Sequence, residues 1–80
     1  SLKCLSGINA DVFEFVAKSN SPVTRKPIRK LDMPKGAIIG GIVRGKQSFI
    51  ATGDLQIMEN DRVVVFSLPE SIQKVDRLFH

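Results

Sequence analysis

The sequence predicts an α+β domain: a small mixed or antiparallel sheet of about four strands, with one short helix and a C-terminal amphipathic helix. Apolar and polar residues alternate near the start of the chain, which is typical of a strand with one buried face. A continuous run of valines at residues 63–65 indicates a second, more buried strand. Apolar residues at helical spacing near the C-terminus indicate a helix that packs on the sheet.

Length and composition fit one domain. The chain has 80 residues, 42% of them hydrophobic and 25% charged, and we expect residues 1–80 to form a single domain. A domain this short buries a smaller share of its surface than a large domain does, so we expect it to gain burial by pairing as a dimer. Because the sequence begins with Ser1 rather than Met, we expect a fragment of a longer protein, with Ser1 and Leu2 as a candidate cloning remnant.

The first expected strand covers residues 11–18, where Phe13 and Phe15 alternate with Val12 and Val16. A Ser-Asn-Ser-Pro stretch follows, and these residue types favour a turn and end the strand.

A short helix is expected at residues 25–31. Thr24 can act as its N-cap, and Pro27 falls in its first turn, where a missing N–H costs little. Ile28 and Leu31, three residues apart, give this helix a narrow apolar face.

Residues 37–44 are expected to form the second strand. Gly40 and Gly41 lie inside it, and glycines there indicate a bulge or a close approach by another backbone. The Gly-Lys pair at 45–46 predicts a two-residue hairpin turn into a third strand at residues 47–51.

The last strand and helix are expected in the C-terminal third of the chain. After a turn at 52–54 and an irregular crossing at 55–57, residues 62–66 predict a strand buried on both faces. Ser67 and Glu70 match a capping box, which predicts that a helix begins there. The predicted buried face of that helix consists of Ile72, Val75, Leu78 and Phe79.

The sequence contains no set of residues that predicts catalysis. Residues 40–46 satisfy G-x-x-x-x-G-K, but Gln47 stands where a phosphate-binding loop needs Ser or Thr, and a strand is expected where that loop needs a helix. Cys4 is the only cysteine and His80 the only histidine, so we expect no metal site and an inert thiol in a reducing, cytoplasmic setting. We expect no membrane-spanning helix, no signal peptide and no enzymatic activity.

Positive charge is concentrated in the first half of the expected domain. The chain carries 12 Lys and Arg against 8 Asp and Glu, a net charge of +4. A solvated face, a site for a phosphate-bearing small ligand and a nucleic-acid-binding surface all fit such a cluster. The five phenylalanines are not interleaved with the basic residues, so no base-stacking platform is visible. The clustered basic residues are Arg25, Lys26, Arg29, Lys30, Lys35, Arg44 and Lys46.

Taken in order, several short segments resemble the C-terminal domain of TrkA-type potassium-uptake proteins, also called the RCK (regulator of potassium conductance) C-terminal domain. The resemblance extends from about residue 11 to residue 79, and its α+β fold has the element order expected above. The segments are VFEFV at 12–16, PIRKL at 27–31, PKGAII at 34–39, GIVRG at 41–45, TGD at 52–54, NDRVVVF at 60–66 and VDRLF at 75–79.

The resemblance implies a regulatory, ligand-sensing and dimerising domain that controls cation transport across the membrane. The implied partners are a second copy, a neighbouring RCK N-terminal domain and a membrane potassium transporter subunit, with no nucleic acid. The implied location is cytoplasmic, at the inner face of the membrane through the transporter. The alternative reading, from charge, is a small basic nucleic-acid-binding module.

The resemblance also implies where a ligand would bind. It implies no cofactor in this domain; a nucleotide or cyclic dinucleotide is the candidate effector, and an NAD or ATP site is expected in the neighbouring domain. In ligand-binding members the pocket involves the short helix, the loop after it and the start of the second strand. The matching residues here are Ile28, Arg29, Leu31, Asp32, Lys35 and Ile38, with Arg44 further along.

Overall fold

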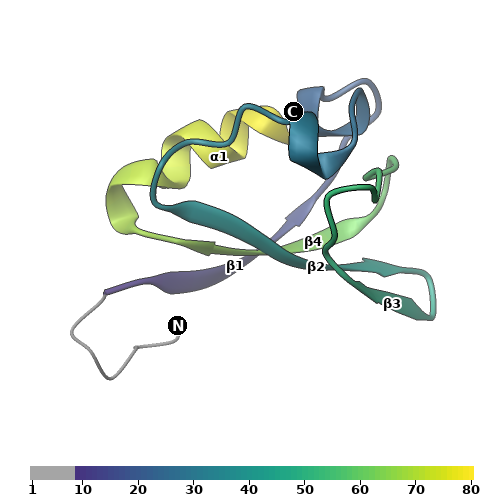
Figure 1. The fold of residues 1–80 in the computed structure, drawn as a ribbon, viewed down its shortest axis with the longest axis horizontal. Coiled ribbons are helices and arrows are strands. Elements are labelled where there is room, and N and C mark those ends of the chain that lie inside the picture. The colour runs from purple at the N-terminus through teal and green to yellow at the C-terminus, as the bar shows by residue number, and fades with distance from the viewer. Residues whose placement is uncertain (1–8) are drawn as a thin grey trace.

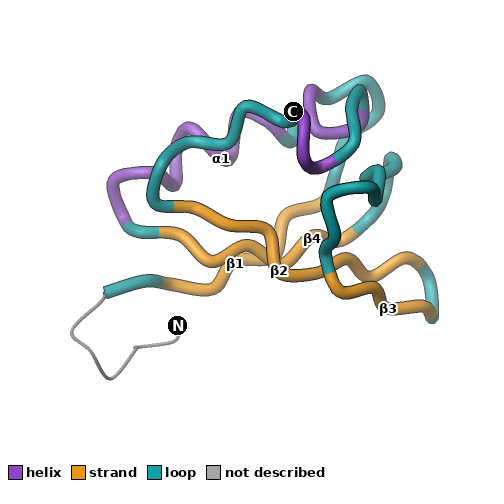
Figure 2. The backbone as a smooth tube through the Cα atoms, viewed as in Figure 1, coloured by secondary structure: helices purple, strands orange, loops and turns teal. Residues whose placement is uncertain are grey.

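The computed structural model describes residues 9–80, so the expectations for Ser1, Leu2 and Cys4 lie outside the described residues. Four antiparallel strands form one sheet in the order β1-β4-β2-β3. Helical segments lie above one face of this sheet (Figures 1 and 2). The predicted α+β class is therefore confirmed. The elements are β1 (Asp11–Val16), β2 (Ala37–Arg44), β3 (Gln47–Ile50), β4 (Arg62–Ser67) and one α-helix, α1 (Ile72–Leu78).

Strand β1 confirms the alternation seen in the sequence. It pairs with β4 so that Phe13 is opposite Val65 and Phe15 is opposite Val63. Residues directly opposite each other in a sheet point to the same side, so these four side chains share the face that the helical segments cover. Phe15 also stacks on Phe79 after α1, with ring centroids 4.9 Å apart.

The hairpin β2–β3 also follows the prediction. Arg44 pairs with Gln47, and Gly45 at the turn adopts φ +59°, a left-handed conformation that glycine reaches without strain. The register of β2 against β4 shifts between Ile39 and Gly41, so Gly40 is the extra residue of a β-bulge. The bulge is confirmed, and since residues 47–50 form a strand, the phosphate-binding loop is excluded there.

The predicted helix at 25–31 is wrong. Two short 3-10 turns replace it, η1 (Pro22–Thr24) and η2 (Ile28–Lys30). Between them Pro27 has ψ 153°, which is extended backbone. The amide of Ile28 donates to the Leu55 carbonyl, so the segment after Pro27 bonds to the crossing near residue 55 and does not extend as a helix.

The capping box at Ser67 is also wrong. Ser67 is the last residue of β4, and its hydroxyl donates to the Leu68 carbonyl oxygen. A third 3-10 turn, η3 (Pro69–Ser71), precedes α1 and has no side-chain cap. Pro69 occupies the first position of that turn, where the missing N–H costs little.

The core lies between the sheet and the helical segments. Strand β4 contributes Val63 and Val65, both fully buried, while Val64 on the opposite face is half-buried. The expectation that β4 is buried on both faces is therefore not met within one chain. The buried apolar residues are Ala17, Val23, Ile39, Ile42, Ile57, Val63, Val65, Val75 and Phe79.

Candidate functional site

The sheet face that points away from the helical segments is covered by no described helix or turn (Figure 1). We call it the outer face. Exposed apolar side chains gather on it: Ile50 is 82% exposed, Ile38 65% and Val16 53%. Solvent-exposed β-branched residues on three of the four strands indicate a surface that another molecule covers. By the strand registers, the outer face comprises Val12, Glu14, Val16, Ile38, Val43, Ser48, Ile50, Arg62, Val64 and Phe66 with Gly40 and Gly41.

Phe66 occupies the outer face and so lies outside the core between the sheet and the helical segments. Its ring lies over the bulge residue Gly40, where an added Cβ would be 2.6 Å from the Phe66 Cε2 atom. Gly40 therefore permits a close approach, but by a side chain and not by a backbone. The phenyl ring stays half-buried and adds apolar area to the outer face.

A cavity of about 670 Å³ opens on the other side of the sheet, between the loop before β2 and the C-terminal helical segments. The loop is tied down by Ser71, whose hydroxyl donates to the Lys35 carbonyl oxygen. Three cations and two carboxylates line the cavity, so its charge favours an anion only slightly. These charged residues are Asp32, Lys35, Glu70, Lys74 and Arg77.

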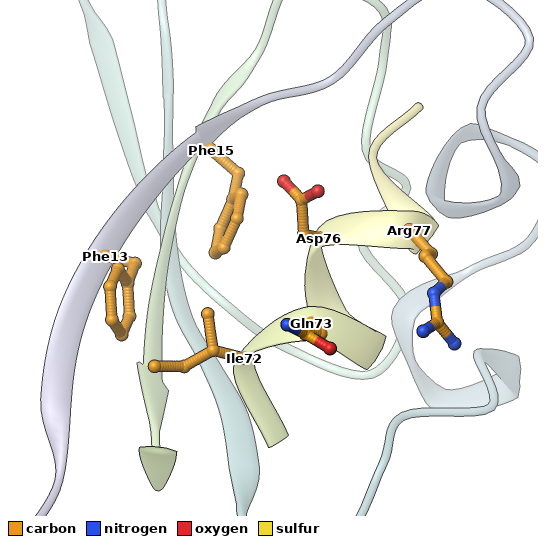
Figure 3. A pocket seen from close by; sticks show the side chains of 6 residues that line it. All are labelled: Phe13, Phe15, Ile72, Gln73, Asp76 and Arg77. Carbon is orange, nitrogen blue, oxygen red and sulfur yellow. The ribbon is translucent and has the colours of Figure 1, made fainter. Parts of the chain in front are cut away.

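A second cavity, of about 360 Å³, lies between β1 and α1. Figure 3 shows Phe13, Phe15 and Ile72 as its apolar floor, with Gln73 beside them and the Arg77 guanidinium directed away from the two phenyl rings. None of the residues predicted as ligand contacts lines this cavity.

Arg44 is held in an ion pair with Asp61. Its Nε donates to Asp61 Oδ1 at 2.9 Å, and its second terminal nitrogen donates to Oδ2 at 2.8 Å. The guanidinium also lies over the Phe49 ring, 5.1 Å from its centroid. Asp61 accepts a further hydrogen bond from the Met58 amide at 2.8 Å, so it organises the turn before β4.

The pKa of Asp61 reflects two opposing effects. Burial of this carboxyl, which is 1% exposed, would raise its pKa. The hydrogen bonds from Arg44 and Met58 and the positive charge of Arg44 outweigh burial, so the pKa of Asp61 is lowered. The hydrogen bond to Asp61 is also the main reason why the pKa of Arg44 is raised.

Arg29, in η2, contacts the turn at residues 52–54. It forms an ion pair with Asp54, and its amide donates to the Gly53 carbonyl oxygen at 3.0 Å. A Cβ at Gly53 would be 3.1 Å from the Arg29 Cβ, so glycine allows the close contact of turn 52–54 with η2.

The structure brings together only some of the predicted ligand contacts. Asp32 and Lys35 share the 670 Å³ cavity, and Leu31 and Asp32 share a smaller one of about 170 Å³. Ile28 packs against the core. Within one chain, the other three predicted contacts are apart from these cavities. They are Arg29 beside Asp54, Ile38 on the outer face, and Arg44 beside Asp61.

The prediction from sequence missed the C-terminal contribution to the 670 Å³ cavity and the apolar character of the outer face. Lys74 and Arg77 fit an ordinary exposed helix face in the sequence, and no local pattern connects them with residues 32–35. The outer face did leave a signal, because Val12 and Val16 alternate with the core residues and yet are apolar.

Neither a metal centre nor a membrane span is found in the described part of the chain. Residues 9–80 contain no group of three or more His, Cys, Asp or Glu side chains placed to hold a metal ion. In the same residues, no helix is long and apolar enough to cross a membrane.

The fold is similar to a solved structure described as an RCK domain with cda (cyclic di-AMP). The TM-score is 0.74, and the match covers 86% of this chain and 97% of the other at 19% sequence identity. At this identity, the likeness defines the class of fold: that of an RCK domain.

The family follows from the sequence comparison. The model of the TrkA-C domain matches residues 12–80. The chain therefore belongs to the TrkA-C domain family, a family of regulatory domains without enzymatic activity, as the resemblance implied.

Two curated relatives support this assignment. The Trk system potassium uptake protein TrkA homolog 1 of Methanosarcina mazei is 38% identical over 79 residues, which are 99% of this chain. The TrkA protein of Azorhizobium caulinodans is 36% identical over 69 residues, which are 86% of this chain. The chain spans 18% of the first relative and 15% of the second.

Proposed function

We propose that this chain is the dimerising, ligand-sensing regulatory domain of a potassium transport protein and controls cation transport across the membrane. The single observation that carries dimerisation is the uncovered apolar outer face, with Ile50 82% and Ile38 65% exposed. Membership of the TrkA-C family and likeness to TrkA proteins support the role in potassium transport.

The occupant of the outer face in this proposal is a second copy of the chain. A small domain buries a modest share of its own surface, and a symmetric dimer adds burial without a second gene product. Two sheets packed through such faces interdigitate their side chains as in a β-sandwich. Pairing would cover β4 on both faces, as its valine run predicts.

The proposed ligand is a phosphate-bearing molecule of the nucleotide or cyclic dinucleotide type. Lys35 from the loop before β2 and Lys74 and Arg77 from α1 bring three cations to one cavity, which the carboxylates of Asp32 and Glu70 also line. The fold's likeness to an RCK domain with cyclic di-AMP makes that dinucleotide the first ligand to test. The predicted contacts Ile28, Arg29, Leu31, Ile38 and Arg44 are kept as proposed contacts in the dimer.

The proposed mechanism is a population shift. A ligand that binds one arrangement of the paired domains more tightly than another favours that arrangement. A neighbouring RCK N-terminal domain and a membrane transporter subunit would respond to this change of arrangement. In this proposal the domain lies at the cytoplasmic face of the membrane.

A thermal-shift titration of the purified chain tests ligand sensing. Cyclic di-AMP, ATP and inorganic phosphate are titrated separately. A ligand at about 100 times its Kd should add about 2.7 kcal/mol of stability, a shift of several degrees in a domain this size. Lys35→Gln and Lys74→Gln should reduce that shift, whereas Lys46→Gln in the β2–β3 turn should not. If none of these compounds shifts the wild-type Tm, the proposal that this domain senses a ligand is wrong.

A further inference from the structure

Two charged side chains lie on the otherwise uncharged outer face. Glu14 on β1 and Arg62 on β4 are the only charged residues among its strand positions, and both are exposed. Within residues 9–80, neither takes part in an ion pair, since the pairs formed there involve Arg29, Arg44 and His80.

Glu14 and Arg62 lie on two adjacent sides of Val64, near the centre of the outer face. Glu14 is directly opposite Val64 on the neighbouring strand, and Arg62 is two residues from Val64 on the same strand. Each charge is therefore one step from Val64, in two nearly perpendicular directions: across the strands for Glu14 and along them for Arg62.

Two copies packed outer face to outer face are related by a twofold axis that lies between the two sheets. The positions of the two charges distinguish the directions that such an axis can take over Val64. An axis along the strands puts each Arg62 over the partner's Arg62, and an axis across the strands puts Glu14 over the partner's Glu14. An axis along the diagonal between these two directions instead lays the strands of one copy across the strands of the other, near a right angle. Each Glu14 then lies over the partner's Arg62. Near-orthogonal crossing is one of the two common ways in which sheets pack.

We propose that Glu14 and the partner's Arg62 form two symmetric ion pairs that set the register of the paired sheets. This inference rests on the proposed dimer. Burying either charge without a partner would oppose association, and like charges in contact would oppose it further. The diagonal arrangement is the one that pairs both charges while it covers the apolar residues. The pairs therefore act mainly on specificity, by excluding the two aligned packings.

Charge exchange between two copies tests the register. In Glu14→Arg, both outer-face charges are positive, and in Arg62→Glu both are negative. Each variant alone should dimerise at least about tenfold more weakly than wild type in analytical ultracentrifugation. An equal mixture of the two should form heterodimers with nearly wild-type affinity, because the diagonal packing opposes unlike charges in both dimers. In an aligned packing the mixture would instead dimerise more tightly than wild type, because the wild-type homodimer would then place like charges together. The double variant Glu14→Arg/Arg62→Glu should also dimerise like wild type.

The mixture separates pairing between copies from pairing within one chain, which mixing cannot restore. Circular dichroism of each variant checks that the fold is intact. If the single variants dimerise as well as wild type, or if the mixture gives no heterodimer, the register is wrong while the dimer stands. If wild type itself is monomeric, the proposed dimer fails and the register with it.

Discussion

At the scale of single residues, the Arg44–Asp61 ion pair places the buried carboxylate of Asp61 in a structural role. Arg44 remains a proposed ligand contact, and in the described chain its guanidinium bonds to Asp61 and the Gln56 carbonyl and lies over the Phe49 ring. The pair connects the end of β2 with the turn before β4. We expect it to act mainly on stability.

Replacing Asp61 with Asn should lower the free energy of unfolding at pH 7 by about 2 kcal/mol, because it leaves a half-buried Arg44 without its counter-charge. The pKa of Asp61 is lowered in the folded state, so the unfolded chain binds the proton first. The stability that the ionised pair provides is therefore present above about pH 4 and is lost as pH falls below it. Urea unfolding at several pH values should show that the difference in free energy of unfolding between wild type and Asp61→Asn becomes smaller in acid.

Asp54→Asn is the matched control for this prediction. Asp54 is also paired with an arginine, but its side chain is 90% exposed, so its loss should change stability by less than about 0.5 kcal/mol. If the difference in free energy of unfolding between wild type and Asp61→Asn stays constant from neutral to acid pH, the stabilising role of the ionised pair is contradicted.

At the scale of elements, the β-bulge in β2 leaves room on the outer face for the Phe66 ring of β4. Gly40→Ala should destabilise the chain by about 2 kcal/mol, because the new Cβ would be 2.6 Å from the Phe66 ring, which must then move. In a Phe66→Leu background, the same change should cost clearly less. Equal costs in both backgrounds, measured by urea unfolding, would show that Phe66 is not what requires glycine here.

The elements also show what the sequence could predict. All four strands were predicted within about two residues, because period-two alternation and Gly-rich turns are local signals. The helix at 25–31 failed because the amides of Ile28 and Arg29 bond to carbonyls at residues 53–55, which is a tertiary effect that local propensity does not contain. The cavity formed by Lys35 and Lys74 was missed for the same reason, since its two sides are far apart in the sequence.

At the scale of the whole molecule, all described helical segments lie on one side of the sheet (Figure 2). The other side is apolar, with one acid and one base near its centre. In a single chain this face exposes residues that sequence patterning treats as buried, and β4 is the clearest case. Pairing of two chains accounts for the valine run of β4, the exposed Ile38 and Ile50, and the lone charges of Glu14 and Arg62 together.

The most direct test of this account is the oligomeric state of the wild-type chain, measured by sedimentation velocity over a range of micromolar concentrations beside Val64→Asp and Lys74→Asp. We predict a dimer for wild type and for Lys74→Asp, whose change lies on the helical side. We predict a folded monomer for Val64→Asp, because an uncompensated carboxylate at the centre of the outer face would oppose pairing. A wild-type chain that is monomeric throughout, or a Val64→Asp variant that still dimerises, would contradict the account.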